Sequence, residues 1–339
     1  MSELEHLPNE VILKVLTYLR VEEIFRCYQV PSKRIKSICH DESLWKKINL
    51  HRCDFVPSEL LQHVLNNGCK FLSLNRSTVV GNLSLENCSQ LRYLDMTKLI
   101  ATDEVKENEV RILTSCHSLE KLSLIGMALS KKMLFSIFYQ NSKTLQVLNL
   151  SRCSGVSMGL IHYCVNLVEL NLEKIDQNTS VDLLTESLST KIEKVSLQFL
   201  KSIRDRHIKK LVTRCKKLRI LHLQGTSIFD ESITTIVKEL KPTLEELDVS
   251  VTHIRLAKLL DLGAMPNLRV LHCYNIIGEI STVKNSLPNV KINDSLLKVA
   301  DSEQNFKPED GIWDVETKRI ELPYYGESTS EDEFDDASS

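Results

Sequence analysis

The feature that most constrains the fold is a leucine pattern that recurs along most of the chain. In the stretch from 145 to 153, LQVLNLSRC, the apolar residues follow the order L-x-x-L-x-L, and a cysteine stands three residues beyond. Side chains alternate between the two faces of a strand, so Leu148 and Leu150 point one way and Val147, Asn149 and Ser151 the other. The stretch therefore predicts a short strand with one face in a core.

The same register starts eleven times, at Trp45, Cys69, Leu91, Leu119, Leu145, Leu167, Ile192, Leu218, Leu244, Leu268 and Leu287. Successive starts lie 19 to 28 residues apart, which is the spacing of leucine-rich repeats. Helical spacing of apolar residues follows the strands, as between 229 and 240. The sequence predicts an α/β solenoid over residues 45–293, with a curved parallel sheet inside and helices outside.

The first 44 residues lie outside the repeats and predict three short helices. Pro8 and Glu10 suit the first turn of a helix, and Ile12, Leu16 and Leu19 follow at helical spacing. A unit this small cannot bury all of its apolar surface. It must pack on the first repeat or offer that surface to a partner, and the high apolar content favours a partner.

The opening Leu7-Pro8-x-Glu10, the apolar helix to Leu19 and the closing Asp41-Glu-Ser-Leu-Trp45 resemble an F-box. The resemblance implies docking on the adaptor of an SCF ubiquitin ligase and, through it, on the cullin and RING subunits. It implies that eight residues meet the adaptor or pack just beneath it: Leu7, Pro8, Ile12, Leu16, Leu19, Val30, Leu44 and Trp45. The run Pro31-Ser-Lys-Arg-Ile35 departs from the Cys-Lys-Arg-Trp of many F-boxes.

Trp45 has a second expected role, because it also begins the first repeat. We expect it to join the N-terminal domain rigidly to the solenoid. The remaining apolar positions of that domain have the same alternative, which is a place in the core of the three-helix unit.

Solenoids of this kind bind partners along the concave strand face. Strand register, with one residue of the tail, predicts a protein-binding set of Asn149, Glu169, Asn171, His222, Asp248, His272, Tyr274 and Trp313. Most polar residues on such a face are only solvated, since a few contacts dominate binding. Because Asn149 points away from Leu148, we expect Asn149→Asp to cost little stability and Leu148→Asp to cost several kcal/mol.

The end of the repeats resembles the S-phase-kinase-associated type of F-box and leucine-rich-repeat protein. The resemblance rests on Leu287-Pro288, on Ile292-Asn293 and on Ile312-Trp313 in the tail. It implies a non-catalytic receptor that presents a protein for ubiquitylation and proteasomal degradation in cell-cycle control. It also implies that residues 294–325 fold back on the repeats.

Some positions depart from that type. Where it offers an aromatic and charged residues to a small cyclin-kinase accessory subunit, this chain has Lys174, Gly225 and Val251. The resemblance is therefore not extended to that subunit.

Charge is distributed unevenly along the chain. After Arg319 there are seven acids and no Lys or Arg, so the formal net charge of −2 hides a body of +5. The Ser- and acid-rich residues 326–339 are typical of disorder. Ser328 and Ser330 each have Glu three residues on, a pattern that acidophilic kinases prefer.

A basic cluster between 201 and 219 has nine Lys or Arg and one acid. It could hold a phosphate, a nucleic acid or the acidic tail. Most of it falls on one predicted outer helix, with Ile208, Leu211 and Val212 as the buried stripe, and no aromatic platform for bases is interleaved. We expect a solvated helix face and no nucleic-acid binding.

No motif of catalysis, metal binding or phosphate binding is present. We expect no enzyme activity, no cofactor and no metal. Ten cysteines without a C-x-x-C predict buried, reduced thiols. With no leader and no apolar run of membrane length, we expect a nuclear and cytoplasmic protein. The alternative to a ligase receptor is a leucine-rich scaffold or inhibitor that acts without a ligase.

Overall fold

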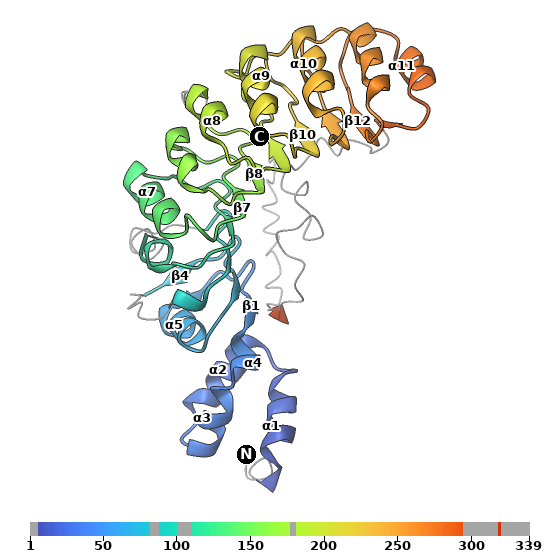
Figure 1. The fold of residues 1–339 in the computed structure, drawn as a ribbon. Coiled ribbons are helices and arrows are strands. Elements are labelled where there is room, and N and C mark those ends of the chain that lie inside the picture. The colour runs from blue at the N-terminus through green and yellow to red at the C-terminus, as the bar shows by residue number, and fades with distance from the viewer. Residues whose placement is uncertain (1–5, 82–87, 100–109, 177–180, 294–317, 320–339) are drawn as a thin grey trace, which may run out of the picture.

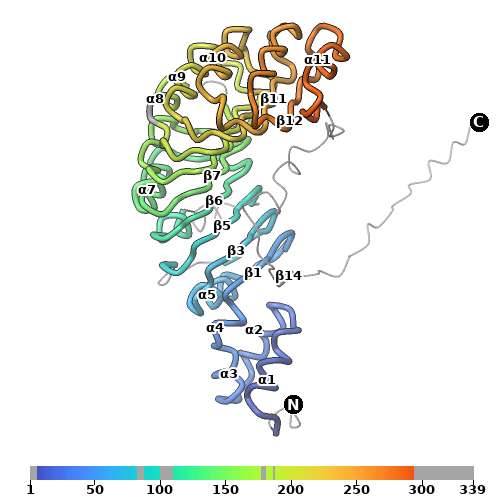
Figure 2. The backbone as a smooth tube through the Cα atoms, turned by 45° about the vertical axis from the view of Figure 1, so that its right-hand side comes forward, coloured from blue at the N-terminus to red at the C-terminus, as the bar shows by residue number. Residues whose placement is uncertain are grey.

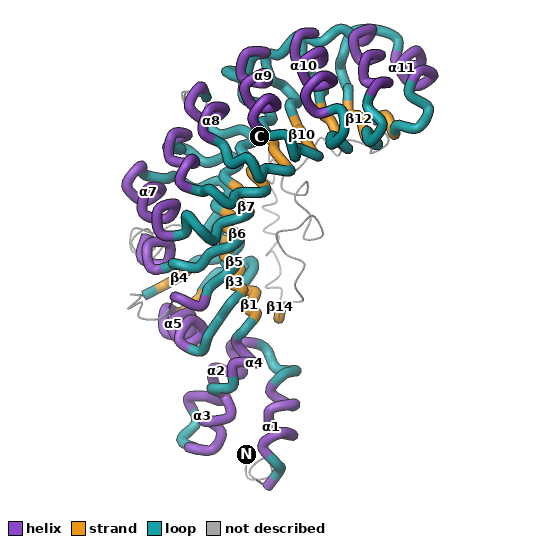
Figure 3. Tube along the Cα trace, viewed as in Figure 1, coloured by secondary structure: helices purple, strands orange, loops and turns teal. Residues whose placement is uncertain are grey.

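The computed structural model describes residues 6–81, 88–99, 110–176, 181–293 and 318–319. A group of short helices at the N-terminus leads into a long arc of repeats (Figure 1). Strands line the inner side of the arc and helices its outer side (Figure 3). The predicted α/β class, with a helical N-terminal unit and a leucine-rich solenoid, is confirmed.

The inner sheet is parallel throughout and has twelve strands. Eleven follow each other in chain order: β1 (Lys47–Asn49), β3 (Phe71–Ser73), β5 (Tyr93–Asp95), β6 (Lys121–Ser123), β7 (Val147–Asn149), β8 (Glu169–Asn171), β9 (Lys194–Ser196), β10 (Ile220–His222), β11 (Glu246–Asp248), β12 (Val270–His272) and β13 (Lys291–Ile292). The twelfth, β14 (Lys318–Arg319), pairs with β1 at the edge nearest the N-terminal helices (Figure 2).

Each of the eleven strands lies where the leucine pattern predicts one. Ten begin two residues after the predicted start, and β13 begins four after it. The leucines point into the core as expected, since Leu148 and Leu150 are 1% and 0% exposed. The stacked leucines of neighbouring turns form one continuous hydrophobic core.

The outer side carries α5 (Ser58–Asn66), a helix at 110–115, α7 (Lys131–Gln140), α8 (Asp182–Ser187), α9 (Asp205–Arg214), α10 (Asp230–Leu240) and α11 (Ile280–Ser286). Two turns carry 3₁₀-helices instead, η3 (Met158–Tyr163) and η4 (Leu256–Ala264). The prediction of helices on the outside holds, although their type varies. A 3₁₀-helix rises about 2.0 Å per residue against about 1.5 Å for an α-helix, so it crosses the outer side with fewer residues. The turn that contains η3 is one of the shortest.

Early in the solenoid the outer side also holds a small two-stranded sheet of β2 (Val56–Pro57) and β4 (Val79–Val80). A short 3₁₀ segment, η2 (Cys88–Gln90), precedes β5. In the described part of the turn after β3, β4 and η2 stand where other turns have an outer helix.

The N-terminal unit consists of α1 (Asn9–Leu16), α2 (Val21–Gln29), α3 (Lys33–Cys39) and α4 (Glu42–Trp45). Ser32 accepts from the Ile35 N–H and so caps α3, whereas Asp41 caps α4 through the Ser43 N–H. Strand β1 starts two residues after α4 ends. No linker therefore separates the helical unit from the first repeat.

Candidate adaptor-docking and substrate-binding surfaces

The outer face of α1 is an apolar stripe. Val11 and Val15 are 42% and 39% exposed, and Tyr18, just past the helix end, is 76% exposed. Pro8, which precedes the helix, is also exposed. Positions 8, 11, 15 and 18 lie on one side of a helix of 3.6 residues per turn. This stripe, Pro8, Val11, Val15 and Tyr18, is apolar surface that the described part of the chain leaves exposed.

The eight predicted adaptor residues divide between surface and core. Ile12, Leu16, Leu44 and Trp45 are at most 4% exposed and pack inside the chain. Pro8 is exposed, whereas Leu7, Leu19 and Val30 are half-buried. The four buried residues thus lie beneath the surface that a partner could touch. The predicted set did not include Val11, Val15 or Tyr18 and placed the contact stripe one residue further round the helix, because the helix is apolar on both sides.

The run that departs from other F-boxes ties α3 to the start of α1. The Arg34 guanidinium donates to Asn9 Oδ1 (2.8 Å) and to the Leu7 carbonyl oxygen (2.5 Å). These bonds hold the segment that leads into the exposed stripe. The third helix therefore packs normally without the tryptophan that many F-boxes carry there.

An aromatic cluster joins the helical unit to the solenoid. His63 of α5 packs edge-on against Trp45, with ring centroids 4.6 Å apart, and its ring also contacts Tyr28 at 4.1 Å and Phe25 at 5.4 Å. The Trp45 indole donates to the Cys39 carbonyl oxygen at 2.5 Å. Burial, with a smaller contribution from the charge of His40, lowers the pKa of His63 to about 4. The two parts therefore share one packed joint, in which Trp45 has the role expected of it.

On the concave face, the third residue of several strands caps the turn that follows. Asn149 Oδ1 accepts from the Ser151 N–H at 3.0 Å, and Asn171 and Asp248 make the same bond at 2.9 Å to the residue two positions on. All three side chains are at most 5% exposed. Three predicted substrate residues thus have a structural role that strand register does not reveal.

The expectation that Asn149 points to solvent was wrong. Its side chain is 1% exposed, and within the described residues its Nδ2 has no hydrogen-bond partner. Neighbouring parallel strands stand about 4.8 Å apart, so a short side chain on the concave face is enclosed by those on either side. Asn149→Asp would place a charge in an enclosed site rather than in water.

Longer side chains on the same face pair across neighbouring strands. Glu169 Oε1 lies 3.0 Å from Lys194 Nζ, and His222 Nε2 lies 2.8 Å from Glu246 Oε1. Burial disfavours the charged form of His222, but the hydrogen bond and charge of Glu246 outweigh it and raise its pKa. The hydrogen bond from His222 lowers the pKa of Glu246 in turn. Glu169 and His222 thus face the concave side as members of pairs.

The last two predicted residues that the structure describes lie near the C-terminal end of the arc. The rings of His272 and Tyr274 are stacked with centroids 6.3 Å apart, and both residues are half-buried. The Tyr274 hydroxyl donates to the Asn293 carbonyl oxygen at 3.0 Å. Trp313 lies outside the described residues.

The N-terminal half of the concave face carries a row of basic and aromatic side chains. Phe71 and Tyr93 meet edge-on at 4.3 Å, Lys47 Nζ lies over the Phe71 ring and Lys121 Nζ over the Tyr93 ring. Each of the four is the first residue of its strand, and none of them belongs to the protein-binding set predicted from strand register.

The turn after each three-residue strand of the inner sheet contains one residue in the left-handed region, three positions beyond the strand's third residue. In chain order these residues are Arg52, Arg76, Lys98, Gly126, Arg152, Lys174, Phe199, Gly225, Val251 and Asn275, with φ between 48° and 76°. Each residue of this set from Arg52 to Val251 donates its N–H to a carbonyl oxygen in the following turn. The acceptor is the residue immediately before the next left-handed residue, so that Arg52 donates to Asn75 and Arg76 to Thr97. They therefore form a column along the edge of the sheet where the strands end.

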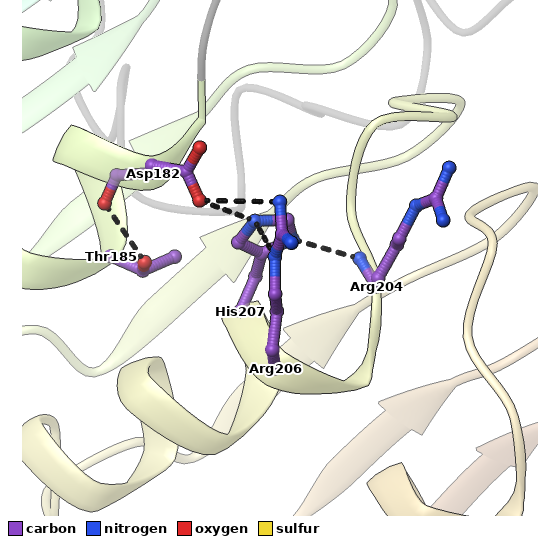
Figure 4. Close-up of polar contacts among 5 residues, drawn as sticks. All are labelled: Asp182, Thr185, Arg204, Arg206 and His207. Atoms are coloured by element: carbon purple, nitrogen blue, oxygen red, sulfur yellow. Dashed lines mark hydrogen bonds and ion pairs between the residues drawn. The ribbon is translucent and has the colours of Figure 1, made fainter.

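Most of the basic cluster at 201–219 belongs to α9 and its flanks, where ion pairs link neighbouring turns. Arg206 lies 3.5 Å from Asp182, and Arg219 lies 2.8 Å from Glu245. The buried His207 accepts from the Arg204 N–H through Nδ1 at 3.0 Å, and its Nε2 lies 2.9 Å from Asp182 Oδ1 and 3.1 Å from Arg206 Nε (Figure 4). The predicted stripe of Ile208, Leu211 and Val212 is fully buried. Much of the basic cluster is therefore occupied in contacts between neighbouring turns of the solenoid.

The cysteines carry no separate site. Nine of the ten are buried and Cys27 is half-buried, and burial raises the pKa of Cys164 to about 12. Within the described ranges no group of three or more His, Cys, Asp or Glu side chains is placed to hold a metal ion. None of the helices in that part of the chain is long and apolar enough to cross a membrane.

Comparison with known proteins gives relatives for both parts. Residues 4–51 match the F-box-like family, and residues 59–320 match the family described as the SKP2 LRR domain. An FBD-associated F-box protein of Arabidopsis thaliana is 23% identical over 299 residues, which cover 82% of this chain and 72% of the relative.

Two solved structures are similar in outline. An internalin of Listeria monocytogenes is 14% identical, with a TM-score of 0.42, over 80% of this chain and 93% of its own. The yeast Rad7 and Elc1 complex contains a chain that is 16% identical, with a TM-score of 0.47, over 74% of this chain and 77% of its own. The repeat-family match extends over most of the sequence, so this protein belongs to the family of F-box proteins with SKP2-type leucine-rich repeats.

Proposed function

We propose that this chain is the substrate-recognition subunit of an SCF ubiquitin ligase, acting in the nucleus and cytoplasm and in cell-cycle control. Its F-box docks on the adaptor and thereby on the cullin and RING subunits. Its solenoid holds a protein substrate for ubiquitylation and proteasomal degradation. The chain is non-catalytic and contributes proximity, because it holds the substrate where other subunits act on it.

One observation carries the docking half of the proposal. The stripe of Pro8, Val11, Val15 and Tyr18 is exposed on a helical unit that is packed without a linker onto the solenoid. Exposed apolar residues gathered on one helix face are typical of a partner interface. The F-box family match supports the identity of the partner as the adaptor.

The substrate half is supported by the concave face. Three groups of side chains on this face could contact a partner. They are the basic and aromatic row at 47–121, the pairs Glu169–Lys194 and His222–Glu246, and the stacked rings of His272 and Tyr274. A mixed face of this kind suits a folded or extended protein segment better than a small molecule.

The docking test is a double change on the exposed stripe, Val15→Ala with Tyr18→Ala. Alanine retains helix propensity, and neither side chain is in the core. Loss of a central aromatic contact typically costs about 2 kcal/mol or more, so affinity for the adaptor should fall about 30-fold or more. Binding is measured by calorimetry with purified adaptor, and recovery of cullin by pulldown.

The matched control is Lys33→Ala with Ser37→Ala, two exposed positions on α3, and it should bind as the parent does. The stripe variant should keep the parent's melting temperature and its substrate, yet no longer support ubiquitylation. Undiminished adaptor binding by the stripe variant would rule out this face. A folded parent that recovers neither adaptor nor cullin would favour the leucine-rich scaffold or inhibitor instead.

A further inference from the structure

The column of left-handed residues changes character along the arc. Its first six positions hold five cations, namely Arg52, Arg76, Lys98, Arg152 and Lys174, interrupted only by Gly126. Its last four are Phe199, Gly225, Val251 and Asn275. We call the five cations the basic ridge. The ridge is distinct from the F-box stripe and from the concave face, since it follows the edge where the strands end.

The backbone conformation makes these cations unusual. A residue with a Cβ in the left-handed region costs about 1–2 kcal/mol relative to the right-handed one, and glycine avoids most of that cost. Gly126 and Gly225 show that the turn accepts glycine. Five Lys or Arg side chains at strained positions, one above another, indicate that the side chains themselves are used.

The ridge is a continuous row of side chains. A Cβ built on Gly126 would lie 3.3 Å from Lys98 Cγ, so the Lys98 side chain extends over the one glycine in the row. At the far end Lys174 Nζ lies 4.4 Å from the centroid of the Phe199 ring and 3.6 Å from Glu173 Oε1, where the basic part gives way to the apolar part. Five ladder steps of about 4.8 Å separate Arg52 from Lys174, which makes the ridge roughly 24 Å long.

Strand β14 brings the C-terminal segment to the start of the ridge. It runs parallel to β1, with Arg319 opposite Asn49, and Arg52 follows Asn49 by three residues. Because the two strands run the same way, the chain leaves Arg319 at the edge where the ridge begins. The twenty residues that follow hold seven acids and no Lys or Arg. Residues 327–336 can reach the ridge and span about 30 Å when extended.

We propose that the basic ridge is the binding surface for the chain's own acidic segment, residues 327–336. The segment lies across the turns from β1 to β8, pairs its carboxylates with the ridge cations and excludes other polyanions. Phosphate on Ser328 or Ser330 would add about 1.5 to 2 negative charges each and strengthen the contact. Neither the adaptor nor the substrate enters this inference, so it stands or falls independently of the proposed function.

Binding is tested in trans with a chain that ends at residue 325 and a fluorescent peptide of residues 326–339. We expect saturable binding that weakens steeply from 20 to 300 mM salt, as is general for exposed charges. Arg52→Gly, Arg76→Gly and Arg152→Gly together should weaken it at least tenfold. Glycine relieves the strained backbone, which offsets contacts that the arginine side chains lose, so we expect a melting temperature close to the parent value. The melting temperature is measured beside binding, so that a loss of binding is distinguished from unfolding.

The matched control removes three cations elsewhere, Lys132, Lys209 and Lys217, by change to alanine; all three are exposed. Its peptide affinity should stay within about twofold of the parent value, because screening limits the effect of distant charges. Equal losses in the two triple variants would overturn the ridge as the site, since only net charge would then matter. Peptide binding that is absent or insensitive to salt would overturn the proposal as well.

The intact chain is tested by carbodiimide crosslinking at low concentration, which joins lysine amines to carboxylates. We expect intramolecular links from Lys98 and Lys174 to residues 327–336, and more of them when Ser328 and Ser330 carry phosphate. Links mainly to lysines at 201–217, or links only between two copies of the chain, would refute the proposal. The proposal also predicts that the acidic segment competes with other polyanions. If a single-stranded oligonucleotide bound the intact chain as tightly as it binds the chain that ends at residue 325, the proposal would be refuted.

Discussion

At the scale of single residues, the concave face shows that a polar side chain on a strand is not always a surface side chain. Asn149, Asn171 and Asp248 each accept a backbone N–H from the turn beyond the strand and are almost fully buried. An Asx bond of this kind replaces a backbone partner that the turn lacks. These positions therefore hold the repeat together before they can serve any ligand.

Leu148→Asp and Asn149→Asp test this difference at neighbouring positions. Leu148→Asp places a carboxylate among stacked leucines and should destabilise the fold by about 4 kcal/mol or more. Asn149→Asp keeps the oxygen that caps the turn but buries a charge, so we expect a cost of about 1–2 kcal/mol. Urea unfolding at pH 7 measures both. A cost near zero for Asn149→Asp would restore the view that this side chain is solvated.

At the scale of elements, the repeat ladder is predictable and its exceptions are instructive. All eleven strands follow from the leucine pattern, because alternation and a repeat of 19 to 28 residues together admit one register. The exposed stripe of α1 could not be predicted from the sequence, since a helix with apolar residues on both sides has two candidate core faces. The column of left-handed residues could not be predicted either, because Arg, Lys and Phe are not the residues that mark such turns.

The charge pair between β10 and β11 gives these two strands a stability that depends on pH. The pKa of His222 is raised, so its contribution is fully present below the unfolded pKa of about 6.5 and is lost as pH rises through the folded value. The pKa of Glu246 is lowered, so its contribution is lost as pH falls below about 4.5. Asp248 and Glu173 act on His222 in the same direction as Glu246.

His222→Gln should therefore cost more stability at pH 5.5 than at pH 8.5. We expect a difference of a few tenths to about 1 kcal/mol, because the pair is partly exposed. Chemical denaturation of parent and variant at both pH values gives the number. An equal cost at the two values would mean that His222 is neutral throughout.

At the scale of the whole molecule, the aromatic joint decides whether the F-box and the solenoid move as one body. His63 lies between Tyr28 of α2 and Trp45 of α4, with Phe25 and His40 beside it. Burial holds its pKa at about 4 against an unfolded value near 6.5. The stability of the joint is therefore present above about pH 6.5 and declines as pH falls toward 4. No local sequence pattern could reveal this contact, since it joins residues of three helices and the residue just past a fourth.

His63→Phe retains an aromatic ring in the joint and removes its titration. Between pH 7.5 and 5 the parent should lose more stability than the variant, as measured by the melting temperature of each. His117→Gln serves as the control, because it removes an exposed histidine outside the joint. Parallel pH profiles for parent and His63→Phe would show that another group governs the acid sensitivity.

The pairing of β14 with β1 also determines how the molecule carries a mechanical load. Arg319 lies beside Asn49, so a pull between the helical unit and the C-terminal end acts across one two-residue ladder and leaves the intervening arc unstretched. An unfolding motor that pulls on the C-terminus would first separate β14 from β1, at low force because only two residues pair. The pulling force would then act on β13. Unravelling would start at the end of the arc farthest from the helices, and β1 with its aromatic joint would give way last.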